Sequence, residues 1–159
     1  MQIICYGRSI GVAIVPHIAD TVYYILNQRE FAVPNAVVTE LRKAYCEAIL
    51  GGSAEQAHLV INRGLSAGVI PSRIYLEVLM PAQIEVGARW HAGEVQIPQE
   101  HIATQITLRE MARLREMLKT RRKLGRKAVV SSVEGDQHFI GGQAMADFLV
   151  VDGWEVDFL

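Results

Sequence analysis

Apolar residues recur at intervals of three and four through the middle of the chain, which is the period of an amphipathic helix. The first such stripe covers residues 35–50 and ends at a pair of glycines, which favour a helix end. Ser53, followed three residues later by Gln56, predicts the capping box of a second helix, which Gly68 ends. The positions expected to face inward are Val37, Leu41, Ala44, Ala48 and Ile49 in the first helix, and Ala57, Val60, Ile61 and Gly64 in the second.

Two further helices are predicted on either side of a glycine turn. Pro71 opens the third helix, and Pro81 lies inside its stripe, where the missing backbone donor should kink or split it. Pro98 begins the fourth helix, and Glu100 stands in its first turn, where the helix dipole favours a negative charge. The short loops favour antiparallel neighbours, so we predict a four-helix-type bundle over residues 35–120. Its remaining inward positions are Tyr75, Leu79, Ala82, Val86 and Trp90, then Ala103, Thr107, Met111, Leu114 and Leu118.

The period then changes. Residues 128–133 predict a buried strand, residues 140–151 predict a helix, and residues 154–158 alternate as a second strand. The two strands should be parallel, with a right-handed crossover. The fold class is therefore mainly α, with a bundle followed by an incomplete β-α-β unit of Rossmann-like (flavodoxin-like) type over residues 126–159.

The sequence stops at Leu159, in the second strand of this unit. We therefore expect a truncated domain, whose first strand, normally in the middle of the sheet, has an unpaired edge. Such a chain is expected to self-associate and to bind the ligand of the complete domain poorly.

Composition and charge exclude several classes of function. The net charge is −1, and the one basic run, residues 121–127, lies between two predicted domains, which favours a solvated linker over a nucleic-acid arm. Residues 1–34 show no helix-turn-helix and no basic recognition helix, and their role is open. Residues 1–15 lack the basic flank and the long apolar run expected of a signal peptide, and no stretch approaches the roughly 18 apolar residues of a membrane span. Only two cysteines occur, which indicates no disulfide framework and favours the cytoplasm.

Asp136 and His138 follow the first predicted strand, at the strand end where α/β sheets place ligands. A carboxylate two residues before an imidazole can accept a proton from one ring nitrogen and leave the other free for a metal. Gly141 has no Cβ, so a bulky flat ligand could approach the backbone there. The alternative is an ordinary loop with an exposed histidine, which the strand before it and the helix after it disfavour.

A second constellation lies in the predicted bundle, where nine residues separate Trp90 from Glu100 and His101. Each of these residues also has a plain explanation. Trp90 lies on the apolar stripe and could be a core aromatic, Glu100 could serve the helix dipole alone, and His101 could be a packing histidine.

The Asp136-x-His138-x-x-Gly141 pattern resembles the signature of cobalamin-binding domains. The resemblance implies that His138 is the lower ligand of cobalt, in place of the nucleotide base, with Asp136 as its hydrogen-bond partner. The Trp90-to-Glu100-His101 spacing resembles the helical bundle of light-sensing, adenosylcobalamin-dependent regulators of the CarH and LitR type.

This second resemblance implies a role for each bundle residue. Trp90 covers the upper face of the corrin, and Glu100 and His101 line the space around the adenosyl group. His91, directly after the tryptophan, is implied to become the upper cobalt ligand once light has removed the adenosyl group.

Three functional hypotheses follow. The first is a cobalamin-binding sensory or regulatory module, responsive to light through adenosylcobalamin and without enzymatic activity. It would act through a homo-oligomer or a regulatory protein partner, with no direct nucleic-acid or membrane binding. The second is a corrinoid protein that carries methyl groups for a methyltransferase system, with methylcobalamin as the cofactor. The third is a truncated bundle that no longer binds a cofactor. The Trp90-to-Glu100-His101 spacing favours the first.

Overall fold

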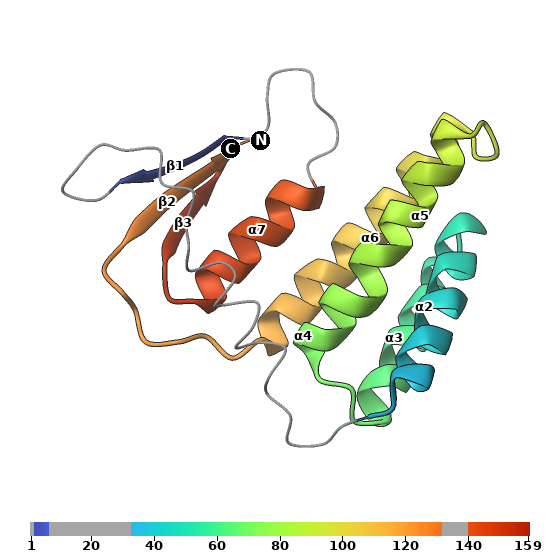
Figure 1. Cartoon of the computed structure of the whole chain (residues 1–159), viewed down its shortest axis with the longest axis horizontal. Coiled ribbons are helices and arrows are strands. Elements are labelled where there is room, and N and C mark those ends of the chain that lie inside the picture. Colours follow the sequence, from blue (N-terminus) through green and yellow to red (C-terminus); the bar gives the residue numbers. More distant parts are fainter. Residues whose placement is uncertain (1, 7–32, 132–139) are drawn as a thin grey trace. The chain divides into compact units, whose positions relative to one another are not determined.

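The computed structural model describes residues 2–6, 33–131 and 140–159, and its contacts divide the chain into two units (Figure 1). The helical unit comprises Gln28–Met117, and the sheet unit comprises Met1–Asn27 together with Leu118–Leu159. The described residues are mainly helical, as predicted. None of the described helices has both the length and the apolar character needed to cross a membrane.

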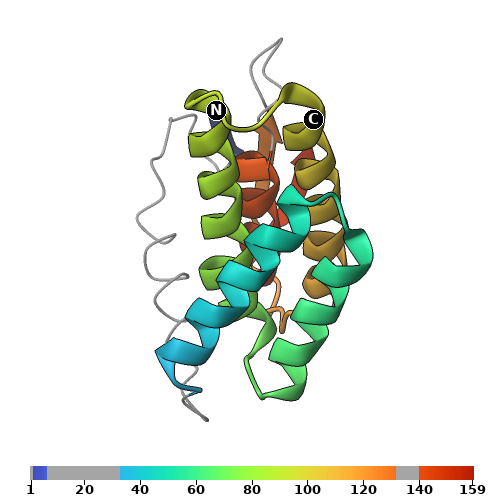
Figure 2. The same cartoon turned by 90° about the vertical axis from the view of Figure 1, so that its right-hand side faces the viewer.

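The helical unit is built from helices that pack closely on one another. The elements are α2 (Asn35–Leu50), α3 (Ala54–Ser66), α4 (Pro71–Ile74), the π-helical segment η1 (Tyr75–Leu79), α5 (Met80–His91) and α6 (Ile97–Met117). Figure 2 shows α2 and α3 side by side, in front of α5 and α6, and α2 contacts α3, η1, α5 and α6.

The ends of these helices follow the predicted signals. Ser53 Oγ accepts a hydrogen bond from the backbone N–H of Gln56 at 3.3 Å, which caps α3. Gly52 and Gly68 have positive φ angles of 69° and 84°, a conformation that glycine adopts without strain and that ends a helix.

Pro81 interrupts its helix as predicted, and the interruption is a π-helical turn. Because Pro81 has no backbone N–H, it cannot make a regular helical hydrogen bond to a carbonyl four residues earlier. The segment η1 precedes it, and the N–H of Met80 donates to the carbonyl of Tyr75, five residues back. The wide turn lets α4, η1 and α5 follow one another without a loop. Such turns often occur at functional sites.

The core of the helical unit confirms most of the predicted stripes, with one shift in α2. Leu41 and Ile49 are buried as predicted, but Val37, Ala44 and Ala48 are only partly buried. The buried positions there are Val38, Tyr45 and Cys46 instead. The largest fully buried side chains of this unit are Tyr45, Tyr75, Ile49, Ile61, Ile74, Leu79, Met111 and Leu114.

The sheet unit contains β1 (Gln2–Tyr6), β2 (Lys127–Ser131), α7 (Ile140–Val151) and β3 (Glu155–Phe158). β2 and β3 are parallel, with Lys127 opposite Glu155, which confirms the predicted β-α-β pairing and is consistent with the start of a Rossmann-like domain. The expected unpaired edge of the first strand is wrong. β1 pairs antiparallel with β2, so β2 is the central strand of three. The sequence of residues 1–15 gave no clear pattern from which this pairing could be inferred.

A small core joins α7 to the sheet. Ala128 and Val130 of β2 pack with Ala146 and Leu149 of α7, and Met145, Trp154 and Val156 cover this cluster. α7 spans the predicted residues 140–151 without any shift.

The basic run of residues 121–127, which leads into β2 and includes its first residue, is exposed, as expected for a linker, yet three of its side chains have partners within the sheet unit. The Arg121 guanidinium donates to Asp152 at 2.8 Å, and Arg126 lies over the ring of Trp154 at 5.4 Å. Lys127 pairs with two carboxylates of β3, those of Glu155 and Asp157. These contacts hold the linker to its own unit.

Candidate cofactor site on helices α5 and α6

One side of α5 carries Trp90, which the sequence singled out, together with two residues that it did not. Gln83, Gly87 and Trp90 are spaced four and three residues apart, so they share one stripe of the helix. Ala82 and Val86, on the neighbouring stripe, are buried in the core. Trp90 is half-buried, and a Cβ built on Gly87 meets no described atom within 4 Å. An aromatic ring and an open stretch of backbone therefore lie on the same side of α5.

The facing helix contributes a matching stripe. Ile97, Glu100 and Thr104 are spaced three and four residues apart in the first two turns of α6. Ile97 is an exposed large apolar residue, whereas the Glu100 side chain is only 18% exposed. His101, beside Glu100, is 55% exposed. We call the two stripes together the α5–α6 face.

A chain of hydrogen bonds joins the two helices across this face. The side-chain amide of Gln83 donates to Thr104 Oγ1 at 2.9 Å, and the Thr104 hydroxyl donates to Glu100 Oε1 at 2.8 Å. The second carboxylate oxygen of Glu100 lies 2.6 Å from Nδ1 of His101. Both oxygens of Glu100 are thus engaged, so its carboxylate is held in one orientation.

Trp90 and His91 meet at the end of α5. Their ring centroids are 5.9 Å apart and their planes are inclined by 61°, an edge-to-face arrangement. The His91 side chain is exposed, so its imidazole is accessible as a ligand.

The remaining predicted site residues belong to the sheet unit. Gly141 is exposed in the first turn of α7, and a Cβ built there meets no described atom within 4 Å. Asp136 and His138 lie outside the described residues. Within the described part of the chain, no group of three or more histidine, cysteine or acidic side chains is arranged to hold a metal ion.

Sequence reasoning missed Gln83 and Thr104, which complete the hydrogen-bond chain. Their positions carried a usable signal, because Thr104 follows Glu100 by four residues and Gln83 precedes Trp90 by seven, both helical spacings. What the spacing could not give is the direction of each hydrogen bond.

One atom of this chain has no partner. Oε1 of Gln83 is buried, and among the described residues it is the single buried side-chain nitrogen or oxygen without a hydrogen bond. Buried acceptors of this kind are rare in native proteins and call for an explanation such as an ordered water or a ligand. Together with the Trp90 ring and the open space at Gly87, the α5–α6 face fits a large flat ligand that carries hydrogen-bond donors.

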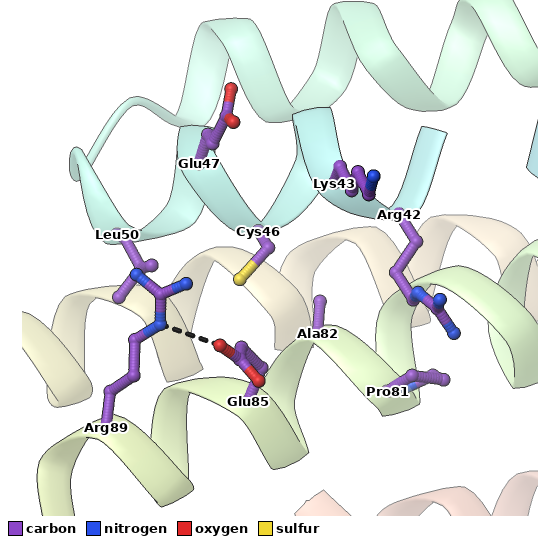
Figure 3. A pocket seen from close by; sticks show the side chains of 9 residues that line it. All are labelled: Arg42, Lys43, Cys46, Glu47, Leu50, Pro81, Ala82, Glu85 and Arg89. Carbon is purple, nitrogen blue, oxygen red and sulfur yellow. Dashed lines mark hydrogen bonds and ion pairs between the residues drawn. The ribbon is translucent and has the colours of Figure 1, made fainter. Parts of the chain in front are cut away.

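A groove lies on the other side of α5. Figure 3 shows this groove of about 420 Å³ between α2 and α5, with the Cys46 sulfur pointing toward α5. Arg89 donates to Glu85 at 2.8 Å within it, and Arg42 and Lys43 line its α2 side. Burial raises the pKa of the Cys46 thiol above its ordinary value, so the thiol is a weak nucleophile at neutral pH. This groove is lined mostly by charged and aliphatic side chains and has no aromatic ring.

The geometry can be set beside known proteins. Residues 41–115 match the family described as B12 binding domain, a range that contains the whole α5–α6 face. No curated protein matches the chain.

Solved structures are also similar, and two of them come from Methanosarcina barkeri. The monomethylamine corrinoid protein of Methanosarcina barkeri aligns with a TM-score of 0.61 and 22% identity, over 76% of this chain and 57% of that one. The methanol:cobalamin methyltransferase complex MtaBC of the same organism aligns with a TM-score of 0.50 and 20% identity, over 94% of this chain and 61% of that one. At these identities the likeness establishes the fold alone, and the chain spans about three fifths of the length of either protein.

The family match lies within the helical unit, and the two solved structures share the fold of this chain. The form of the cofactor and the light-sensing type do not follow from these comparisons.

Proposed function

We propose that this chain is a cobalamin-binding module whose α5–α6 face packs against the upper side of the corrin. The observation that carries the proposal is the B12 binding domain match over residues 41–115, which contains Trp90, Glu100 and His101. Trp90 supplies an aromatic ring on the α5 stripe, Glu100 supplies a fixed carboxylate on the α6 stripe, and Glu100 contacts the exposed imidazole of His101.

Each residue has a defined task in this proposal. Trp90 covers the corrin with its ring and excludes water from the upper face. Glu100, held by Thr104 and His101, presents a fixed acceptor to hydroxyl or amine groups of the upper ligand. His138 supplies the lower ligand of cobalt, with Asp136 fixing its tautomer.

The first prediction concerns affinity. The purified chain, dialysed against adenosylcobalamin or methylcobalamin in dim red light, should bind the cofactor measurably but more weakly than a complete domain would, with absorbance as the readout. Trp90→Ala should weaken binding roughly 10-fold or more because a stacked aromatic contact is lost. His138→Ala should change the absorbance spectrum of the bound cofactor, since cobalt loses its imidazole ligand.

Arg89→Ala is the matched control for Trp90→Ala. Arg89 is the neighbouring residue, but it lines the groove beside α2 and not the α5–α6 face. Its replacement should leave the affinity unchanged. Retention of both cofactors by Trp90→Ala at wild-type affinity would contradict the proposed binding face.

The finer hypothesis is a light-responsive regulator. Adenosylcobalamin supplies a cobalt–carbon bond that light breaks. Glu100 and His101 would hold the adenosyl group in the dark, and the exposed His91 would offer its imidazole to cobalt after illumination. What favours this hypothesis is the spacing of these residues in the sequence, together with the contacts within two pairs, Trp90 with His91 and Glu100 with His101.

A methyl-carrying role is the second candidate. It is favoured by the two corrinoid structures, which are named for monomethylamine and methanol systems. The chain would then present methylcobalamin to a methyltransferase partner and would not itself be an enzyme. The two candidates differ in the preferred cofactor, because a methyl carrier has no use for an adenosyl-binding carboxylate. A clear preference of the wild-type chain for methylcobalamin would favour this second role.

A further inference from the structure

We propose that Gln83 is a further residue of the cofactor site, whose side-chain carbonyl accepts a hydrogen bond from an N–H or O–H group of the bound corrinoid. This inference rests on the proposed function, because it names a recognition residue for the same ligand.

The neighbouring bonds fix the orientation of the Gln83 amide. A threonine hydroxyl has one hydrogen, and that of Thr104 is donated to Glu100 Oε1. The Thr104 oxygen must therefore accept from Gln83, which turns the NH₂ group toward Thr104 and the carbonyl away from it. Flipping the amide would point two acceptors at each other, so the carbonyl cannot take the place of the NH₂ group.

The carbonyl left over is the buried acceptor without a partner among the described residues. Burying such an oxygen costs free energy unless a donor meets it. The hydrogen-bond chain thus holds Gln83 in an arrangement that is unfavourable by itself, which is typical of a residue placed for a ligand.

Open space lies one helical turn from Gln83. The next residue along the same stripe of α5 is Gly87, where a Cβ would meet no described atom within 4 Å. The stripe then reaches Trp90, the residue proposed to cover the corrin. Because Gln83 Oε1 is itself buried, the Gln83 side chain has to shift toward a group that approaches the helix beside Gly87 to accept its hydrogen bond.

Two parts of the ligand carry suitable donors. The corrin ring bears amide side chains, which are present in every cobalamin. The adenosyl group adds ribose hydroxyls and an adenine amine, which methylcobalamin lacks. The chemistry shared by the two sources is a neutral N–H or O–H donor, and comparing the two cofactors separates them.

The test is the dissociation constant of the full chain for adenosylcobalamin and for methylcobalamin, measured by equilibrium dialysis. Gln83→Met keeps the length of the side chain but removes both the acceptor and the donor to Thr104, and should weaken binding roughly 3- to 10-fold. Thr104→Val breaks the same hydrogen bond but keeps the Gln83 carbonyl, so it should weaken binding less than Gln83→Met does. A loss for both cofactors assigns the donor to the corrin amides, and a loss for adenosylcobalamin alone assigns it to the adenosyl group.

Gln56→Met is the matched control, since it makes the same substitution at an exposed glutamine in the first turn of α3. Circular dichroism of each apo variant shows whether it is folded. Should Gln83→Met fail to fold, Gln83→Ala carries the same test with a residue of high helix propensity.

The outcomes separate the two proposals. Unchanged affinity of folded Gln83→Met for both cofactors overturns the inference alone and leaves an ordered water as the partner of Oε1. A wild-type chain that binds neither cofactor overturns the proposed function, and the inference falls with it.

Discussion

The Tyr45 hydroxyl donates to Thr107 Oγ1 at 3.1 Å, and both side chains are fully buried in the helical unit. This contact explains why the buried side of α2 is shifted from the predicted stripe. A helical pattern of apolar residues predicts that Ala44 is buried and that the neighbouring tyrosine is not. The large ring of Tyr45 fills more of the core, however, once its hydroxyl has a partner on α6. Periodicity alone could not reveal that partner, which is 62 residues away.

Removing either end of this bond should destabilise the fold. Tyr45→Phe leaves the buried Thr107 hydroxyl without its donor, at an expected cost of about 1 kcal/mol in the free energy of unfolding. Thr107→Val should cost at least as much because the phenol remains. The double variant should lose less unfolding free energy than the sum of the two single losses, since neither polar group then remains buried without its partner. Urea unfolding measures all four proteins, and strictly additive losses would contradict the coupling.

The same tyrosine should make the fold sensitive to alkali. Burial raises the pKa of the Tyr45 phenol well above its ordinary value of 10.0, so the folded state keeps the proton that the unfolded state loses. Its contribution to stability is therefore full below pH 10 and declines as the pH rises further, by up to about 1.4 kcal/mol per pH unit. Tyr45→Phe lacks this slope. Unfolding free energies of the two proteins should thus converge as the pH rises above 10, and parallel curves would argue against the shift.

Among the site residues, the sequence identified those with distinctive chemistry and missed those that position them. Trp90, Glu100 and His101 stand out by residue type and spacing. Gln83 and Thr104 are ordinary helix residues in the sequence, and their importance comes from two hydrogen bonds between neighbouring helices. Packing between α5 and α6 decides those bonds, and no pattern within one helix encodes it.

At the scale of elements, local signals predicted what local chemistry determines. The glycine and serine helix ends, the interruption at Pro81 and the bounds of α7 all depend on residues within one turn of the chain. The pairing of β1 with β2 depends on segments more than a hundred residues apart, and the sequence did not predict it. The π-helical form of η1 was also missed, because an interior proline is equally compatible with a kink.

The turn between α7 and β3 depends on one glycine. Gly153 has a φ of 95°, and a Cβ there would lie 2.4 Å from the carbonyl oxygen of Arg122. Gly153→Ala combines backbone strain with a clash against the linker, so it should cost more than about 2 kcal/mol of stability. Gly125→Ala is the control, since Gly125 also has a positive φ, 64°, but nothing lies within 4 Å of its Cβ position.

The Gly125→Ala control should lose only the stability that backbone strain costs, about 1 kcal/mol. Thermal unfolding followed by circular dichroism compares the two variants with the wild type. Equal losses in both would mean that the contact with Arg122 contributes nothing.

At the scale of the whole molecule, the helical unit and the sheet unit contain different parts of the proposed cofactor site. The helical unit contains the complete hydrogen-bond chain from Gln83 to His101 and the full extent of the B12 binding domain match. The sheet unit contributes a parallel β-α-β pairing and the segment in which Asp136 and His138 stand. The upper-face hypothesis can therefore be tested on described contacts, whereas the lower-ligand hypothesis rests on the sequence pattern.

The last prediction concerns the response of the whole chain to light. If the chain is an adenosylcobalamin-dependent regulator, the loaded protein should elute differently from a size-exclusion column in the dark and after green illumination. A ligand shifts a conformational or oligomeric equilibrium only through different contacts in the two states, and loss of the adenosyl group removes its contacts with Glu100 and Trp90. The protein loaded with methylcobalamin supplies the comparison, because it loses no adenosyl contacts under the same light.

A His91 variant provides a second test of the light-responsive role. Its exposed imidazole beside Trp90 is proposed to bind cobalt after illumination, so His91→Ala should release the illuminated cofactor faster during dialysis while binding it normally in the dark. His101→Ala is the contrasting variant, since His101 contacts Glu100 and should affect the dark form first. Identical elution in the dark and in the light, with absorbance proving loss of the adenosyl group, would exclude the light-responsive role. The methyl-carrying role would then be the better account of the same binding face.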